Sequence, residues 1–262
     1  MIKKHLIPLA VIILLLIMAK VFTYTLPNEK NHLTNNTSSP ENAVKEDSEK
    51  EASPFNIHQL TFADETLPLG DARVSGKMER TLAAFGYEQL QTYRLHRKAE
   101  EWFPIIEPIL AAYGIPNDFK YMPLVESGLK AGVSPRGAAG YWQFMPATAR
   151  MYGLKVNTRI DERNNLRKST IAACRYLKEL YGIFESWTLV AAAYNVGDVH
   201  LRRQINRQNQ DNYFKMKLNR ETGGYVYKLI SVKEIVENPQ RNGYREQKPL
   251  LAYRSTADTQ VE

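Results

Sequence analysis

Glu126 is the first residue along the chain whose surroundings suggest acid–base chemistry. It ends the apolar run 121–125, and Ser127 and Gly128 follow at once. An ionised carboxylate there would face the negative end of a helix dipole among apolar neighbours, and both effects raise its pKa. A carboxylic acid that stays protonated near neutral pH is what a general acid requires. The alternative interpretation is an ordinary glutamate at a helix end.

A second stretch, residues 134–146, combines small residues with groups that suit sugar binding. Small residues at 137–140 precede Tyr141, Trp142, Gln143, Phe144 and Met145. Small residues let the backbone approach a ligand or another segment closely. Gln143 can hydrogen-bond an amide or hydroxyl, and the aromatic pair before it can stack on a sugar face. The alternative is a tight turn into a helix at Pro146 with core side chains, which we favour for Trp142 and Phe144.

A third polar pair, Tyr194 and Asn195, ends the nearly all-apolar run 187–194. Buried polar groups are hydrogen-bonded, so these two side chains should meet a specific partner. Gly197 suits the left-handed residue that often ends a helix. An internally bonded tyrosine and a helix-capping asparagine are the alternative.

The composition excludes most thiol and metal chemistry. The chain has a single cysteine, Cys174, which excludes a disulfide framework and a cysteine-ligated zinc site. Cys174 falls on an apolar helical stripe and is interpreted as a core residue. No two of the five histidines are close in sequence: His5, His32, His58, His96 and His200. We therefore expect no metal site. Lys and Arg do not cluster with aromatic residues, so no nucleic-acid partner is expected.

The N-terminus has the layout of an export signal. Lys3 and Lys4 precede the apolar run Leu6–Ala19, whose 14 residues are short for a membrane span of about 20 residues. If Lys20 snorkels, the run extends to Leu26 and can span. Residues 1–27 are therefore either a cleaved signal peptide or a signal anchor.

The charge is unevenly placed along the chain. Residues 28–54 are acidic and polar, without helical or strand periodicity, and 28–73 is predicted to be a disordered linker with an extended lead-in. The net charge of +7 then belongs to the remaining residues, 55–262. A basic exported domain suits an acidic polymer or a membrane surface, although a solvated basic surface explains the charge equally well.

The remainder reads as helical, with few strand signals. The predicted catalytic domain covers 74–240, and 241–262 is predicted to be a frayed tail. Apolar periodicity and stop signals predict a first helix from near Pro104 to Gly114 and a second that Asn117 or Asp118 caps and that runs through Val125. A third helix is predicted from Pro146 to Gly153, and a fourth begins at a cap formed by Ser169 or Thr170. Three more are predicted over 187–194, 199–207 and 225–237.

Taken together, these stretches resemble the family 1 lytic transglycosylases, nearest to their membrane-bound D-type murein members. The matching blocks are Glu126-Ser127, Ser134-Pro135, 137–146, 193–197 and Glu221-Thr222-Gly223-Gly224-Tyr225-Val226. The resemblance covers about 102–237 and implies a mainly α, lysozyme-like fold of the goose-type or SLT kind. The loop from Glu126 to Ser134 is one residue shorter than in the best-known members, and no LysM-type repeat is evident.

The resemblance also implies an activity and a set of residue roles. The expected reaction cleaves the β-1,4 bond between N-acetylmuramic acid and N-acetylglucosamine in peptidoglycan, with formation of a 1,6-anhydro ring and without a cofactor. Glu126 would act as acid and then as base, Tyr225 would hold it, and Tyr194 would hold it or bind the N-acetyl group. The other expected substrate contacts are Ser134, Gln143, Met145, Asn195 and Glu221. Asp118, Asp161 and Glu162 are interpreted as caps or surface ion pairs.

Three other functions and a cellular location are also considered. The first alternative is a hydrolase like the goose-type lysozymes, and the second is a membrane-tethered, non-catalytic glycan-binding module. A chitinase-like activity is a third and weaker alternative. The expected partner is peptidoglycan, and the expected protein is an exported, periplasmic monomer that residues 6–26 anchor to the inner membrane if they are not cleaved.

Overall fold

A computed structural model describes residues 60–68, 70–90, 93–126 and 133–245, which all belong to one unit of the chain, 51–262. The predicted signal or anchor at 6–26 and the acidic linker up to residue 59 lie outside the described residues. None of the helices in the described ranges has the length and apolar character that a membrane span needs.

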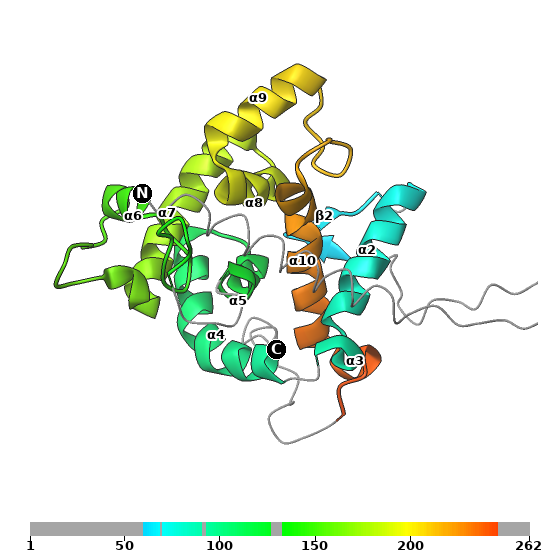
Figure 1. The fold of residues 1–262 in the computed structure, drawn as a ribbon, viewed down its shortest axis with the longest axis horizontal. Helices are drawn as coiled ribbons and strands as arrows, with labels where there is room; N and C mark the ends of the chain where they lie inside the picture. Colours follow the sequence, from blue (N-terminus) through cyan, green and yellow to red (C-terminus); the bar gives the residue numbers. More distant parts are fainter. Residues whose placement is uncertain (1–59, 69, 91–92, 127–132, 246–262) are drawn as a thin grey trace, which may run out of the picture. The chain divides into compact units, whose positions relative to one another are not determined.

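The described part is mainly helical, as the sequence predicts (Figure 1). A short antiparallel hairpin, β1 (Thr61–Phe62) and β2 (Glu65–Thr66), comes first. The α-helices that follow are α2 (Ala72–Phe85), α3 (Tyr87–Leu90), α4 (Arg94–Tyr113), α5 (Met122–Glu126), α6 (Pro146–Met151), α7 (Leu166–Phe184), α8 (Trp187–Val196), α9 (Asp198–Gln208) and α10 (Arg220–Glu237). The 3-10 helices are η2 (Asn117–Tyr121), η3 (Glu162–Asn164) and η4 (Gln240–Asn242).

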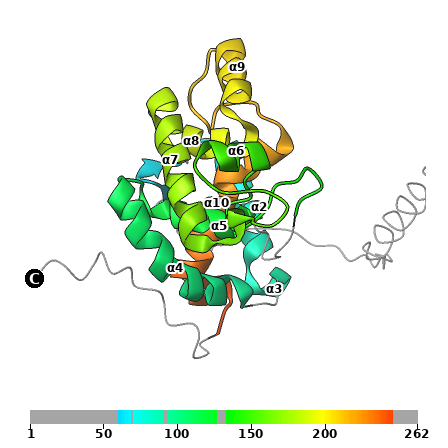
Figure 2. The ribbon, with the colours of Figure 1, turned by 90° about the vertical axis from the view of Figure 1, so that its left-hand side faces the viewer.

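Helix α10 organises the packing. It contacts α2, α8 and α5, while α4 packs against α7. Figures 1 and 2 show the short helix α5 held between α4 and α10. Because α5 ends at Glu126, its position between two long helices places this carboxyl inside the fold.

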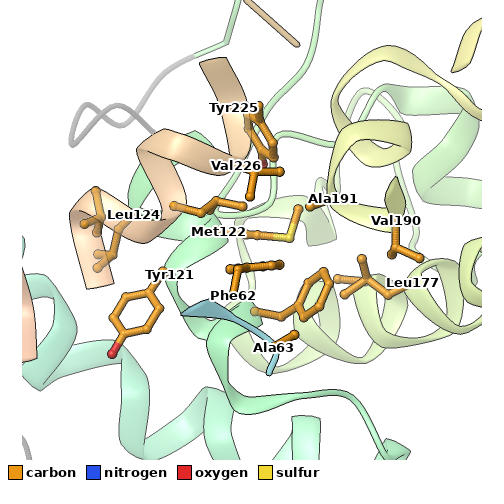
Figure 3. Packing of buried hydrophobic residues seen from close by; sticks show 14 of the residues in the cluster. Phe62, Ala63, Tyr121, Met122, Leu124, Leu177, Val190, Ala191, Tyr225 and Val226 are labelled. Carbon is orange, nitrogen blue, oxygen red and sulfur yellow. The ribbon is translucent and has the colours of Figure 1, made fainter. Parts of the chain in front are cut away.

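The core joins the hairpin to the central helices. Figure 3 shows Phe62 of β1 and Met122 of α5 packed near Leu177 of α7, Val190 of α8 and Val226 of α10. All five side chains are buried, and each large apolar side chain contributes roughly 1.5–3 kcal/mol when it leaves water. Residues 188–193 of α8 are all buried, as predicted for this helix. This packing fixes the positions of the ends of α5, α8 and α10 relative to one another.

Three predicted helix starts are wrong. Helix α4 begins at Arg94, well before Pro104, because Leu95 and Ala99 extend its buried face, and both of its prolines lie inside it. Helix α7 begins at Leu166, where the Asn165 side chain accepts the Lys168 N–H at 2.9 Å. The predicted caps Ser169 and Thr170 are instead buried within α7 and donate their hydroxyls back to main-chain carbonyls one turn earlier.

The third wrong start concerns α10, which begins at Arg220 rather than near Tyr225. Asn219 caps it by accepting the Thr222 N–H at 2.9 Å. Glu221 is therefore a first-turn residue of a long helix, a position that favours a negative charge. The predicted cap at 117 or 118 begins the 3-10 helix η2 instead, and α5 follows that helix directly.

The three other carboxylates are caps and ion pairs, as predicted. Asp118 pairs with Lys233 at 2.8 Å and accepts the Ala63 N–H at 2.7 Å. Asp161 caps η3 and pairs with Arg163 at 2.7 Å. Glu162 pairs with Lys168 at 2.6 Å. Each of these carboxylates already has a cationic partner in the fold.

Ordered structure extends beyond both predicted edges of the 74–240 domain. The β1–β2 hairpin lies in the expected lead-in, and its Phe62 is fully buried. At the other edge, Tyr244 is buried and donates its hydroxyl to the Phe85 carbonyl at 3.0 Å. Residues 241–245 are therefore part of the fold and not of a frayed tail.

The hairpin also caps α8. The Glu65 carboxylate accepts the main-chain N–H groups of Trp187 and Thr188 and the hydroxyls of Ser186 and Thr188. A carboxylate on the first N–H groups of a helix satisfies their hydrogen bonds and favours the helix dipole. The opposite end of the same helix carries Tyr194 and Asn195.

Gly140 marks the closest approach between the 134–145 loop and the chain at Arg163. Its φ is +79°, and a Cβ there would lie 2.0 Å from the Arg163 carbonyl oxygen. Gly137 has a φ of +89° but open space around the Cβ position. A substitution at Gly137 therefore tests the backbone conformation alone, whereas one at Gly140 tests the conformation and the close packing together.

We predict that Gly140→Ala destabilises the protein more than Gly137→Ala does. Gly137→Ala should cost about 1–2 kcal/mol of unfolding free energy, the penalty of a left-handed alanine. Gly140→Ala should cost about 1–3 kcal/mol more, because its methyl group overlaps main-chain atoms. Urea unfolding of both variants and wild type measures the difference. Equal losses would contradict the close approach.

Candidate active site

Glu126 is the ionisable group at the centre of the candidate site. It ends α5, is partly exposed, and accepts a short hydrogen bond on Oε1 from the Tyr225 hydroxyl. Burial is the main cause that raises the pKa of Glu126 to about 7, against the lowering effect of the Tyr225 hydrogen bond. The negative charge of Glu221 raises the pKa further, and the positive charge of Lys228 lowers it. The carboxyl is thus partly protonated at neutral pH and can donate a proton.

The physical cause differs in part from the one that the sequence suggested. Helix α5 has only five residues, so its dipole is small compared with that of a long helix. Packing between α4 and α10 removes the carboxyl from water instead. The predicted direction of the pKa shift agrees with the structure, but its main origin is tertiary burial.

Hydrogen bonds between Tyr213 and the main chain on either side fix the position of Tyr225. Its side chain is 2% exposed, and Figure 3 shows it beside Val226 and near Met122 of α5. The Tyr213 hydroxyl donates to the Thr222 carbonyl at 2.7 Å and accepts the Val226 N–H at 3.2 Å. These two bonds flank Tyr225 along α10 and fix the turn that presents its hydroxyl to Glu126.

Asn195 joins α8 to the same turn of α10. Its Oδ1 accepts the Thr222 hydroxyl at 3.0 Å. Thr222 is buried, whereas Glu221 beside it is exposed. The predicted site residues Asn195, Glu221 and Tyr225 therefore meet at the first turns of α10, although the sequence did not reveal that Thr222 connects them.

Tyr194 has a different partner from the two that the sequence suggested. Its hydroxyl donates to the Trp142 carbonyl at 2.8 Å, and its ring lies 5.3 Å from the Tyr176 ring. Burial, followed by the negative charge of Glu126, raises the pKa of the Tyr194 phenol. Tyr194 is thus electrostatically coupled to Glu126, while its proton is committed to the 134–145 loop.

The 134–145 loop contains the other predicted contacts. The Ser134 hydroxyl accepts the Ala138 N–H at 3.0 Å, and the Gln143 amide donates to the Gly140 carbonyl at 2.9 Å. Met145 directly precedes α6 and is 43% exposed. Gln143 has a φ of +46°, an uncommon conformation for a residue other than glycine and one that is frequent at functional sites.

The aromatic residues of this loop divide into core and surface. Trp142 and Phe144 are buried, as favoured from the sequence, and the Trp142 indole donates to the Thr170 hydroxyl at 3.0 Å. Neither ring is available to stack on a sugar. Tyr141 stays partly exposed, with its ring edge-on to Trp102 at 5.0 Å.

Sequence reasoning missed three residues that shape the site: Arg163, Tyr213 and Thr222. Arg163 donates to two carbonyls of the 134–145 loop, and the other two connect α8 and α10. Arg163 and Tyr213 bind mostly main-chain atoms, so no side-chain pattern in the sequence could have identified them. Thr222 stands in the matching block 221–226 but had no assigned role. Over the described ranges, no three His, Cys, Asp or Glu side chains are grouped so that they could hold a metal ion.

Comparison with known proteins shows what this part of the chain is similar to. Residues 104–217 match the family model described as "Transglycosylase SLT domain". The membrane-bound lytic murein transglycosylases D of Escherichia coli strains K12 and CFT073 are each 32% identical over 154 residues, which are 56% of this chain and 34% of theirs. A protein of Alteromonas sp. strain M-1 named for tributyltin chloride resistance is 28% identical, over 57% of this chain and 74% of its own.

The matched segment, residues 104–217, is similar to the transglycosylase SLT domain. It contains Glu126, the 134–145 loop and the end of α8, whereas Glu221 and Tyr225 follow it in the chain. The chain spans about a third of the length of the Escherichia coli relatives.

We predict that Glu126→Gln becomes more stable relative to wild type as the pH rises. The folded-state pKa of Glu126, about 7, exceeds the unfolded value of 4.5, so the folded wild type loses stability as the pH rises from 4.5 through 7. Glutamine does not ionise, so the stability difference should shift in its favour by about 2–3 kcal/mol between pH 5 and pH 8. Urea unfolding at both pH values measures this.

Glu100→Gln is the matched control, because Glu100 is an exposed glutamate of α4. Its stability should follow that of wild type at both pH values. Parallel curves for Glu126→Gln and wild type would contradict a buried carboxyl with a raised pKa.

Proposed function

We propose that the chain is a peptidoglycan lytic transglycosylase with Glu126 as its single acid–base residue. The observation that carries the proposal is a half-buried carboxyl with a pKa raised to about 7 and a tyrosine hydrogen bond, inside a segment that matches the SLT domain model. The substrate would be the β-1,4 bond between N-acetylmuramic acid and N-acetylglucosamine. The product would carry a 1,6-anhydro ring on the muramic acid.

In the first step, the Glu126 carboxyl gives its proton to the glycosidic oxygen while the C1–O bond breaks. Positive charge then develops at C1, and the carbonyl oxygen of the sugar's own N-acetyl group stabilises it. A glycosidase that lacks this help needs a second carboxylate. The Tyr225 hydroxyl stabilises the carboxylate left on Glu126, because a hydrogen bond to a charged acceptor is stronger than one to a neutral acceptor.

In the second step, the C6 hydroxyl of the same sugar attacks C1. Glu126 takes the hydroxyl proton, the 1,6-anhydro ring closes, and the acid is restored without water. Holding the hydroxyl close to C1 supplies the advantage of an intramolecular reaction. Burial serves both steps, because a pKa near 7 lets one carboxyl donate and then accept a proton.

The other predicted residues would bind the glycan around this centre. Ser134, Gln143 and Met145 would contact sugars from the 134–145 loop, with exposed Met145 offering an apolar surface. From α8, Tyr194 would accept a hydrogen bond from the N-acetyl group on its hydroxyl oxygen while its proton stays hydrogen-bonded to the Trp142 carbonyl, and Asn195 would contact the glycan. Glu221 would line the site from α10.

The cellular setting is part of the proposal. The domain would have the lysozyme-like fold of the goose-type and SLT enzymes. Residues 6–26 would direct export and either anchor the protein to the inner membrane or be cleaved. The enzyme would then act as a periplasmic monomer on peptidoglycan strands, and the net charge of +7 would favour this anionic polymer.

We predict that Glu126→Gln abolishes cleavage of purified sacculi while glycan binding persists. Glutamine keeps the shape of the side chain but cannot give up a proton. Mass spectrometry of the wild-type digest should show muropeptides lighter by one water than the hydrolysis products. Sacculus cleavage by Glu126→Gln at the wild-type rate would disprove the assignment, and binding without cleavage by wild type would indicate a non-catalytic glycan-binding module.

A hydrolase is the second candidate, because Glu221 places a second carboxylate within electrostatic reach of Glu126. In an inverting hydrolase this residue would activate water. Glu221→Gln would then abolish cleavage, and wild type would release ordinary reducing ends. The transglycosylase mechanism requires no carboxylate at 221, so it predicts that Glu221→Gln still forms anhydro products.

We predict opposite shifts of the pH–activity profile for two neighbours of Glu126. Activity should fall as the pH rises through the pKa of Glu126, because the acid loses its proton. Glu221→Gln removes a charge that raises this pKa, so the fall should move to lower pH; Tyr225→Phe removes a hydrogen bond that lowers it, so the fall should move to higher pH. The pH dependence of kcat/KM on a soluble peptidoglycan glycan measures both, and shifts in the same direction would contradict the assignment.

A further inference from the structure

Arg163 has a buried guanidinium group that points at the 134–145 loop. Its side chain is 7% exposed, and because arginine is rarely buried without partners, specific partners are expected. Asp161 binds one edge of the guanidinium, through Nε at 2.8 Å and Nη2 at 2.7 Å. The remaining nitrogen, Nη1, donates to the carbonyls of Gly137 at 2.8 Å and Phe144 at 3.0 Å.

These two carbonyls lie on opposite sides of the loop's turn. Between them, Ala139 and Phe144 form an isolated antiparallel bridge, and the Gln143 N–H donates to the Gly140 carbonyl at 3.2 Å. Arg163 therefore joins both arms of the turn through a single nitrogen. The 2.0 Å approach of a Gly140 Cβ to the Arg163 carbonyl shows that the main chain of residue 163 also lies against this turn.

The chemistry of the pair suits positioning and not substrate binding. Asp161 neutralises the guanidinium, and the side chain is too buried to meet a glycan. Arginine offers five N–H donors in a planar fork, so it can bind a carboxylate and two carbonyls at once. Lysine has a compact charge and three rotatable donors, and it cannot reproduce that geometry.

We propose that Arg163 is a positioning residue that holds the 134–145 loop in its substrate-binding shape. The role in catalysis rests on the proposed glycan-cleaving function. Arg163 acts through Gln143 and Met145, which follow the Gly140 turn, and leaves the proton chemistry of Glu126 unchanged. Its loss therefore weakens glycan binding more than it slows the chemical step.

The test compares Arg163→Gln and Arg163→Lys with wild type on a soluble peptidoglycan glycan. KM should rise by about tenfold, because hydrogen bonds from a charged donor to two carbonyls are lost, while kcat should change less than about threefold. The pH at which activity falls should not move, and Arg163→Lys should recover only part of the loss. A fall in kcat at unchanged KM, or a KM equal to that of wild type, would overturn the proposal.

Lys168→Gln is the matched control. Lys168 pairs with Glu162, the neighbour of Arg163, but its side chain is 55% exposed and contacts no residue of the loop. Because the Lys168 side chain is mostly exposed and its ion pair runs to Glu162, this variant should retain the wild-type KM. A tenfold rise in KM for Lys168→Gln as well would mean that any disturbance of the 161–168 segment acts on the loop, and the specific role of Arg163 would be rejected.

Hydrogen exchange tests the loop independently of catalysis. The amides of Ser134, Ala139 and Gln143 donate within the loop and should exchange faster in Arg163→Gln, while amides of α4 and α8 keep their protection. If wild type cleaves no glycan but these amides exchange faster in Arg163→Gln, the proposed function fails while the positioning role of Arg163 stands. Unchanged loop exchange rejects this role, and Arg163→Lys provides the same measurement if Arg163→Gln does not fold.

Discussion

The Tyr225 hydroxyl donates a hydrogen bond to Glu126 and so ties the candidate acid to helix α10. It links the end of a five-residue helix, α5, to the first turns of the long helix α10. Helix α5 is too short to be stable alone, so tertiary contacts must hold its carboxyl in place. The geometry of the acid is therefore a property of α10 and its neighbours more than of the segment that carries Glu126.

Helix α10 supplies that support along much of its length. Besides Tyr225, it contributes Lys233, which pairs with Asp118 at 2.8 Å, and Glu237, which accepts the Tyr121 hydroxyl at 2.6 Å. Both partners lie in η2, which directly precedes α5, so α10 holds the segment before the acid as well as the acid itself. The same helix is tied to α8 through Thr222, and Glu65 caps the far end of α8. Glu65 of the hairpin thus helps to fix the site from a distance.

The sequence allowed prediction of what depends on local pattern. The all-apolar run of α8 predicted its burial, and the setting of Glu126 predicted the direction of its pKa shift. The start of α4 was missed because Pro104 is a common first helical residue, yet the buried face extends back to Leu95. Contacts between distant segments left no local signal: Arg163 binds main-chain carbonyls, and Glu65 caps a helix more than a hundred residues away. The role of Glu126 and its neighbours in catalysis remains a prediction.

The two halves of the candidate site face different physical demands, and the fold meets them by different means. Glu126 needs a low-polarity setting, which core packing provides at a cost in stability once the carboxyl ionises. In the proposed function the 134–145 loop presents the exposed Met145, and its small residues at 137–140 bury little apolar surface compared with the core side chains of Trp142 and Phe144. The hydrogen bonds from Arg163 to two loop carbonyls supply a constraint on the loop's shape, because they fix the direction of the contact as well as its distance. The Arg163–Asp161 pair therefore orders the loop without net charge, whereas the charges that shift the pKa of Glu126 are those of Glu221 and Lys228.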